Sequence, residues 1–208
     1  GKTVVAMAML LTAVAAGYQG ALMAPTEVLA EQHFLGIRRL LEHLVQPSLE
    51  PDWFTVTFDP HPSPVSIGLL TGSTKAAARR ELIRRAAEGT LDILVGTHAL
   101  IQKDVNLSRL AMAVVDEQHR FGVIQRAALR ENAKQMPHLL LMSATPIPRT
   151  LALTIYADLD ASAIPELPSG RIPIMTRIVP SDRWTDAEQF IIDQVEQGRQ
   201  AFVVCPLI

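Results

Sequence analysis

The chain has 208 residues, a length that suits one large domain or one domain with part of a second. Hydrophobic residues amount to 49% but aromatic residues to only 5%, so an aliphatic core and layered α/β packing are expected. The net charge of −2 gives no overall signal for nucleic-acid binding, so any basic residues that bind one must be clustered locally. The single cysteine, Cys205, excludes a disulfide framework within the chain and is expected to be an inert core thiol.

The first apolar run, residues 4–16, follows one positive charge and therefore resembles a signal peptide. It is shorter than the roughly 20 residues that a membrane span needs, and no membrane association is predicted. Because the run has no polar face, we expect a helix that is buried on most sides and ends at Gly17. A strand at 20–23 follows, and Thr26 is expected to cap the next helix. The start at Gly1, without a methionine, suggests a truncated chain.

Short apolar runs then alternate with helical patterns to the end of the chain. Residues 46–64 contain five prolines and no periodicity, which predicts a surface insertion or long loop rather than core. The expected strands are 65–70, 91–95, 110–115, 138–142, 174–179 and 200–205. The expected helices are 75–88, 121–135, 149–156 and 185–197, the last with a capping box between Thr185 and Glu188. This alternation predicts β–α–β crossovers and a parallel sheet.

Two carboxylates, Asp116 and Glu117, directly follow a predicted strand. They could simply cap the next helix, but strands of open α/β sheets also present ligand-binding residues at their carboxyl ends. Gly1, Lys2 and Thr3 precede a helix and match the last three residues of a phosphate-binding loop. Together the two patterns predict a nucleotide site in which Thr3 and Asp116 hold Mg²⁺ and Glu117 orients or deprotonates water.

The order of these motifs resembles the helicase core of superfamily 2, and closely the RecG branch-migrating DNA helicases. The residues 116–123, Asp-Glu-Gln-His-Arg-Phe-Gly-Val, match the DEQH box in its RecG-like form. The other matching segments are 1–3, 24–33, 70–73, 95–102, 142–153, 156–160 and 166–171. The run from the DEQH box through 171 is the most specific part of the resemblance.

The resemblance implies a RecA-like P-loop NTPase fold, a parallel sheet with flanking helices. It assigns residues 1–157 to a first RecA-like domain, 158–173 to a linker and 174–208 to the beginning of a second RecA-like domain. Residues 46–64 are an insertion relative to the family in this assignment.

The resemblance also implies ATP and Mg²⁺ as cofactors and branched or forked DNA as the partner. The residues it assigns to ATP binding are Gly1, Lys2, Thr3, Asp116 and His119, with Lys2, Asp116 and Glu117 catalytic and Thr3 and Asp116 ligating Mg²⁺. The residues it assigns to nucleic-acid contact or to coupling are Pro25, Thr26, Gly72, Thr97, His98, Ser143 and Thr145. Such contacts go mostly to phosphates and do not read sequence. Taken alone, His119 could be a surface histidine and Ser143 a strand-end cap.

The implied function is ATP-dependent unwinding and branch migration of Holliday junctions and stalled forks in DNA repair and recombination. The alternatives are a transcription-repair coupling translocase and a non-enzymatic nucleotide-binding scaffold. We expect a cytoplasmic monomer. The 208 residues alone are expected to be inactive, because the first half of the phosphate loop and the arginines of the second domain are not among them.

Two further groups of residues bear on binding. Arg79, Arg80, Arg84 and Arg85 could form a phosphate-contacting patch, but a solvated helix face with a Glu81–Arg85 pair is favoured. The histidines show no metal-ligand spacing with one another or with Cys205, so no zinc site is predicted.

Overall fold

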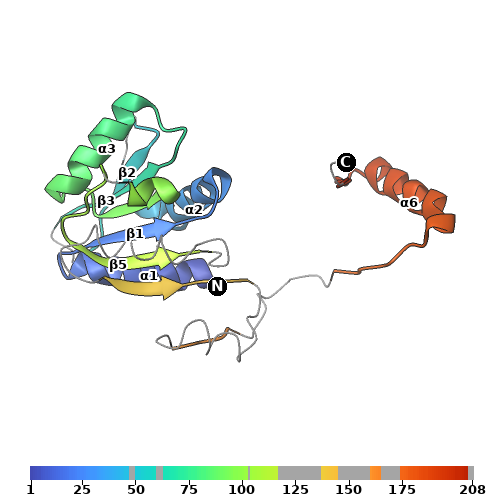
Figure 1. Ribbon diagram of the computed structural model, residues 1–208, viewed down its shortest axis with the longest axis horizontal. Helices are drawn as coiled ribbons and strands as arrows, with labels where there is room; N and C mark the ends of the chain where they lie inside the picture. Colours follow the sequence, from blue (N-terminus) through green and yellow to red (C-terminus); the bar gives the residue numbers. More distant parts are fainter. Residues whose placement is uncertain are drawn as a thin grey trace. The chain divides into compact units, whose positions relative to one another are not determined.

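The structure is a computed structural model of the 208-residue chain. It describes residues 1–46, 50–59, 63–102, 104–116, 137–144, 160–164 and 174–205. The chain divides into two compact units, Gly1–Ile164 and Pro165–Ile208, and their boundary lies within the predicted linker. The first unit holds a sheet with its covering helices, and the second holds helix α6 (Figure 1). The assignment of the second unit to a second RecA-like domain stays a prediction.

One six-stranded sheet, in the order β2-β3-β4-β1-β5-β6, forms the centre of the first unit. The strands are β1 (Gln19–Met23), β2 (Trp53–Val56), β3 (Val65–Leu70), β4 (Ile93–Gly96), β5 (Leu110–Val115) and β6 (His138–Leu141). All neighbouring pairs are parallel except β2 and β3, which are antiparallel. The predicted α/β fold with a parallel sheet is therefore confirmed.

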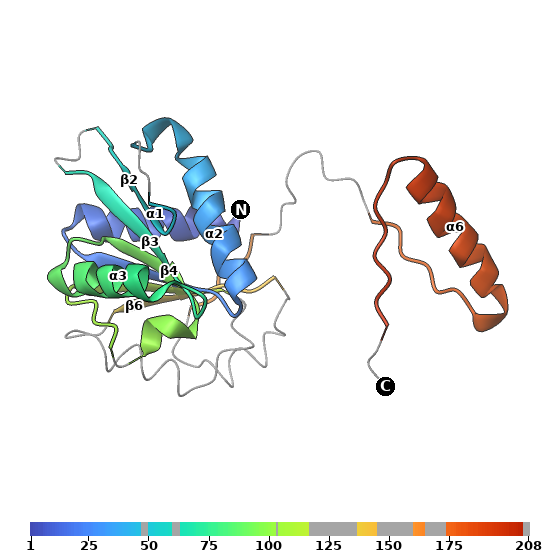
Figure 2. The ribbon, with the colours of Figure 1, turned by 90° about the horizontal axis from the view of Figure 1, so that it is seen from above.

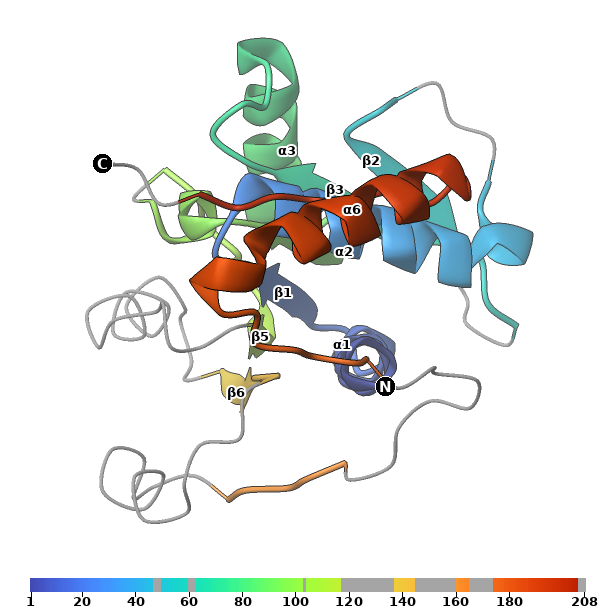
Figure 3. The ribbon, with the colours of Figure 1, turned by 90° about the vertical axis from the view of Figure 1, so that its right-hand side faces the viewer.

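Helices cover both faces of this sheet. Helices α1 (Lys2–Ala15) and α2 (Glu27–Leu40) lie on one side and α3 (Ala76–Glu88) on the other, as the end-on view of the strands shows (Figure 3). Side chains alternate along each strand, so Leu22 of β1 joins the core beneath α1 and α2, whereas Ala21 and Met23 face the core beneath α3. Burial on both faces explains the near-continuous apolar runs of the strands.

The helix ends follow the predicted signals. The Thr26 hydroxyl accepts a hydrogen bond from the Leu29 N–H (3.3 Å) and caps α2. Gly17 follows α1 and Gly89 ends α3, with φ of 83° and 74°, in the left-handed region that favours glycine.

Helix α1 is buried on a narrower face than its composition predicts. The buried side chains are Ala6, Met7, Leu10 and Val14, which pack against the sheet. Val4, Val5 and Met9, by contrast, are 39–55% exposed, so the expectation of burial on most sides is wrong. The sheet can cover only one side of a helix that lies against it. Of the helices in the described ranges, none is long and apolar enough to cross a membrane.

Strand β2 corrects the prediction that residues 46–64 lie outside the core. It pairs with β3 at the edge of the sheet (Figure 2), and the side chains of Phe54 and Val56 are fully buried. The ring of Phe54 packs against that of Phe34, with centroids 5.1 Å apart. The prolines of this region lie outside the strand and therefore leave its hydrogen-bonding pattern intact. Whether 46–64 is an insertion relative to the family stays a prediction.

The second unit differs most from expectation. Helix α6 spans Trp184–Glu196, but its N-cap is Arg183 and no side chain caps it, so the Thr185–Glu188 capping box is wrong. Glu188 instead accepts a hydrogen bond from the Trp184 indole N–H (3.1 Å). The strands predicted at 174–179 and 200–205 are also wrong, because neither segment pairs with another strand in the described part of the chain. Cys205 is exposed rather than a core thiol. The helices predicted at 121–135 and 149–156 lie outside the described residues.

Gly96, the last residue of β4, offers a test of how closely the strands approach. A Cβ added at Gly96 would overlap the carbonyl oxygen of Leu70 on the neighbouring strand. We therefore expect Gly96→Ala to destabilise the intact protein by about 1–3 kcal/mol, because backbone must move to admit the methyl group. The measurement is the shift of its thermal unfolding transition.

Gly36 of α2 provides the matched control. A Cβ there meets nothing within 4 Å, so Gly36→Ala is expected to stabilise the protein by about 0.5–1 kcal/mol through helix propensity. Equal shifts of the same sign for the two variants would contradict the steric explanation.

Candidate functional site

The carboxyl ends of five parallel strands form one aligned row. The last residues of neighbouring strands are paired in register, Leu70 with Gly96, Gly96 with Met23, Met23 with Val115, and Val115 with Leu141. The backbone hydrogen bonds continue one residue beyond the strands. The N–H groups of Ala24, Asp116 and Met142 donate to the carbonyls of Gly96 (2.8 Å), Met23 (2.9 Å) and Val115 (2.8 Å), respectively. The N–H of Thr97 donates to the carbonyl of Leu70 (3.4 Å). Residues immediately after the strands therefore share one edge of the sheet.

This edge brings together most of the residues singled out in the sequence. Residues predicted to contact nucleic acid, couple the two sites or bind metal follow β1, β3, β4, β5 and β6 directly: Pro25, Thr26, Gly72, Thr97, His98, Asp116 and Ser143. Glu117, His119 and Thr145 lie outside the described residues, and the roles of all the predicted site residues stay predictions.

Helix α1 begins at the same edge. It leads through Gly17 into β1 and runs in the opposite direction to the strand, so that its first turn lies where β1 ends (Figure 1). The helix packs closely on β1, because a Cβ at Gly20 would lie 2.5 Å from Cδ2 of Leu10. Lys2 and Thr3 are partly exposed in this first turn. The first turn of a helix offers free N–H groups and positive potential, which favour phosphate.

Asp116 has a partner that the sequence did not indicate. Nε2 of His33, on α2, lies 2.7 Å from Oδ2 of Asp116, and both side chains are 12% exposed. The two residues are 83 positions apart, beyond the reach of any spacing argument. The available signal was that His33 lies within the segment 24–33 that resembles a helicase motif.

The start of α2 lies beside the turn that follows β3. A Cβ at Gly72 would lie 2.7 Å from Oε1 of Glu27, the first residue of α2. This places Thr26 and Gly72, two of the predicted nucleic-acid contacts, on adjacent segments. A side chain at position 72 would displace Glu27 from its present position.

After β4, two neighbouring residues differ in accessibility. Thr97 is 2% exposed, and its hydroxyl accepts a hydrogen bond from the Ala99 N–H (3.4 Å) at the start of the short helix η2 (His98–Ile101). His98 is exposed. Thr97 therefore orients this turn, while the His98 side chain is the one accessible to a ligand.

Carboxylates pair with most of the arginines of α3, and the predicted Glu81–Arg85 pair is confirmed, although the Arg79 and Arg85 side chains are only partly exposed. Glu81 accepts hydrogen bonds from Arg84 and from Arg85, the latter at 2.7 Å, and Arg84 also pairs with Glu88. Hydrogen bonds from Arg84 and Arg85 lower the pKa of Glu81 to about 2. Because this pKa is depressed, the stabilisation it reflects is present above the ordinary carboxyl pKa of 4.5 and lost as the pH falls towards 2.

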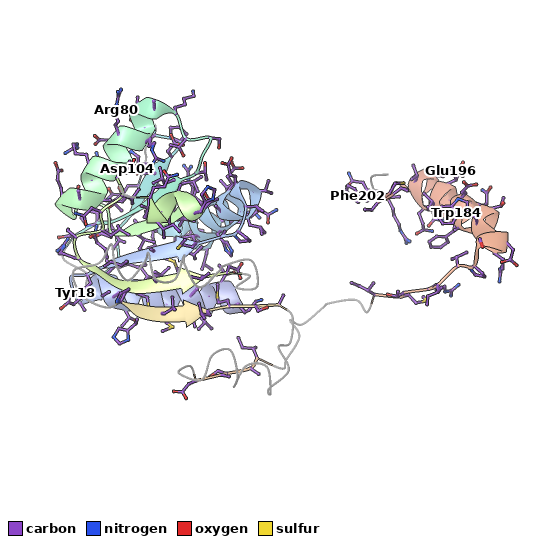
Figure 4. All side chains as sticks on the ribbon, viewed as in Figure 1. Tyr18, Arg80, Asp104, Trp184, Glu196 and Phe202 are labelled. Carbon is purple, nitrogen blue, oxygen red and sulfur yellow. The ribbon has the colours of Figure 1, made fainter. Side chains whose placement is uncertain are left out.

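The remaining arginines of the helix differ in their surroundings. Arg79 pairs with Asp104 (2.9 Å), and its hydrogen bond lowers the pKa of that carboxyl group. Arg80 projects from the exposed side of α3 (Figure 4). The carboxylates that surround Arg79, Arg84 and Arg85 argue against a phosphate-binding patch on this helix.

Comparison with known proteins identifies relatives of this arrangement. The DEAD/DEAH box helicase family matches residues 1–154. The chain is 49% identical to the ATP-dependent DNA helicase RecG of Synechocystis sp. and 48% identical to that of Bacillus subtilis, in each case over 208 residues and 100% of the chain. It covers 23% and 28% of those proteins, so it spans about a quarter of the length of the curated relatives it matches.

Solved structures agree with the sequence comparison. A structure of RecG bound to a three-way DNA junction superposes with a TM-score of 0.75 at 37% identity, over 100% of this chain and 25% of that one. The Mycobacterium smegmatis helicase Lhr matches with a TM-score of 0.59 at 20% identity, over 95% of this chain and 27% of that one, which shows the fold alone. The RecA-like helicase fold and the resemblance to RecG, both predicted from the motifs, are confirmed.

Proposed function

Because the chain belongs to the DEAD/DEAH box helicase family, we propose that it forms the ATP-binding part of a RecG-type DNA helicase. The intact protein, in this proposal, uses ATP to unwind and branch-migrate forked or branched DNA. The observation that supports the proposal is the aligned row of strand ends, since residues predicted to bind nucleotide or nucleic acid follow these strands. The high identity to proteins named RecG supports it.

The start of α1 and the end of β5, which we call the nucleotide half of the edge, suit ATP with Mg²⁺. The hydroxyl of Thr3 and the carboxylate of Asp116 are the hard oxygen ligands that Mg²⁺ takes, and no zinc is part of the proposal. When bound, Mg²⁺ supplies neutralisation of the charge on the phosphates. Gly1, Lys2 and the first turn of α1 hold the phosphates, and Glu117 accepts the proton of the attacking water.

The nucleic-acid half of the edge suits contacts to a phosphate backbone. Its residues follow β1, β3 and β4 and are Pro25, Thr26, Gly72 and His98, while the buried Thr97 orients the turn that carries His98. Contacts of this kind position DNA without reading its sequence, which agrees with recognition of branched shape. We propose that His119, Ser143 and Thr145 connect this half to the nucleotide, and that the protein works as a monomer in the bacterial cytoplasm.

The test is ATP hydrolysis by the intact protein with three DNAs of equal nucleotide content: a three-way junction, a linear duplex and a single strand. We expect the junction to stimulate turnover most and to be unwound in an ATP-dependent manner. Equal stimulation by linear duplex without unwinding would instead support the coupling translocase. Nucleotide binding without hydrolysis on any of the DNAs would support the scaffold.

A further inference from the structure

His33 and Asp116 form a contact between α2 and the end of β5. The Nε2–Oδ2 distance of 2.7 Å is that of a short, charge-assisted hydrogen bond, and both side chains are 88% shielded from solvent. A shielded pair is screened little by salt and has a defined geometry. This separates it from the exposed pair of His43 and Glu42, whose atoms are 3.6 Å apart and whose side chains are 92% and 62% exposed.

The hydrogen bond from His33 orients the carboxylate of Asp116, and the backbone of Asp116 is itself held by the sheet. The Asp116 N–H donates to the Met23 carbonyl of β1, so the main chain at this position follows the sheet. The hydrogen bond from His33 to Oδ2 then restricts the rotation of the side chain. A carboxylate has about four lone-pair positions on two oxygens, so a hydrogen bond at Oδ2 is compatible with metal ligation by the same group.

The helix that carries His33 begins at the nucleic-acid half of the edge. Thr26 caps α2, and His33 lies seven residues later, about 10 Å along the axis and on nearly the same side of the helix. The first turn also packs beside Gly72. Backbone hydrogen bonds join the successive turns of the helix, so a displacement of its first turn is expected to be passed on to His33.

We propose that His33 is a positioning residue for Asp116, and that it links the nucleic-acid edge to the Mg²⁺ ligand through α2. The proposal rests on the proposed function, because it takes Asp116 as a ligand of the Mg²⁺ that accompanies ATP. Ligating carboxylates are commonly held by a second hydrogen bond, and loss of such a partner lowers metal affinity by about 10–100-fold. His33 provides that second bond from an element that also reaches the DNA side.

The test uses the intact helicase with His33→Met and His33→Gln. Methionine fills a similar length without a donor, whereas the amide of glutamine places an N–H at a similar distance from the backbone as Nε2 does. The readout is the Mg²⁺ concentration required for half-maximal binding of a fluorescent, non-hydrolysable ATP analogue, with and without a three-way junction. His33→Met is expected to raise this concentration about 10–100-fold, and His33→Gln to leave it close to the wild-type value.

The junction DNA separates positioning from a merely structural role. It is expected to lower the Mg²⁺ requirement of the wild type and of His33→Gln, but not that of His33→Met. His43→Met is the matched control, because that exposed histidine lies beyond the end of α2, and it is expected to change nothing. Should His33→Met fail to fold, His33→Asn, whose side chain is too short to reach Oδ2, carries the same expectation.

The outcomes distinguish this proposal from the one it rests on. Wild-type protein that binds the nucleotide with Mg²⁺, together with an unchanged Mg²⁺ requirement in His33→Met, overturns the role of His33 alone. A lowered unfolding temperature with an unchanged Mg²⁺ requirement also overturns it, since it identifies a purely structural pair. Wild-type protein without Mg²⁺-dependent nucleotide binding overturns both proposals.

Discussion

Glu117→Gln in the intact helicase is expected to reduce ATP turnover by about 10²–10⁴-fold while ATP continues to bind. The reason is the position of Glu117 directly after Asp116, whose backbone is fixed against β1 at the edge proposed to bind the nucleotide. Glutamine has nearly the same shape as glutamate but cannot accept a proton from water at neutral pH. In the proposed function the phosphates are held by Lys2, Thr3 and the start of α1, which the substitution leaves in place.

The experiment measures the two quantities separately. Steady-state hydrolysis with saturating junction DNA gives the turnover, and fluorescence of a bound nucleotide analogue gives the affinity. Glu42→Gln is the control, because Glu42 has a 62% exposed side chain and lies beyond the far end of α2. Unchanged turnover in Glu117→Gln would remove the assignment of the base. Loss of both turnover and binding would show a role in holding the nucleotide.

Gln19→Leu is expected to destabilise the protein by about 2–5 kcal/mol, since it leaves the Leu91 carbonyl and the Arg109 N–H without the partner that Gln19 provides. Gln19 begins β1 and is fully buried. Its amide donates to the carbonyls of Ala86 (2.9 Å) and Leu91 (2.7 Å), and its Oε1 accepts from the Arg109 N–H (2.9 Å). The side chain thus joins the end of α3 to the segments that lead into β4 and β5. Leucine fills the volume but makes none of these bonds.

The shift of the thermal unfolding transition of the intact protein measures this effect, and hydrogen exchange of the β1 amides localises it. Gln46→Leu is the matched control. Gln46 makes an exposed hydrogen bond to Thr57, and its replacement is expected to change stability by no more than about 0.5 kcal/mol. Similar losses in the two variants would mean that the buried hydrogen bonds of Gln19 carry no special stability.

The sequence predicted a strand correctly where an apolar run is bounded by polar residues on the side where the strand ends. β3 and β5 have the predicted bounds, because each is a short apolar run that ends at polar residues. β2 was missed, since four residues among prolines show no alternation that can be read without the neighbouring strand. The segments 174–179 and 200–205 have the composition of strands, but composition cannot supply the partner backbone that makes a strand.

The sequence could predict which site residues lie at the carboxyl ends of the strands. Thr26, Thr97 and Asp116 lie at one edge because parallel strands place their carboxyl ends together, and the chain order of the motifs was enough to expect this. The contact of His33 with Asp116 was not predictable, since it depends on how α2 crosses the sheet. The burial of Thr97 was likewise decided by the turn of η2 rather than by residue type.

Because the strand ends are aligned, the number of residues in each strand fixes the position of the residues that follow it. One residue added or removed within β4 would move Thr97 and His98 by about 3.3 Å relative to Asp116 and turn the strand's side chains between the change and Thr97 to the opposite face. Changes of length between α3 and β4, at the other end of the sheet, leave the row intact. Related chains are therefore expected to vary in length at the amino ends of these strands and to keep the number of residues within them constant.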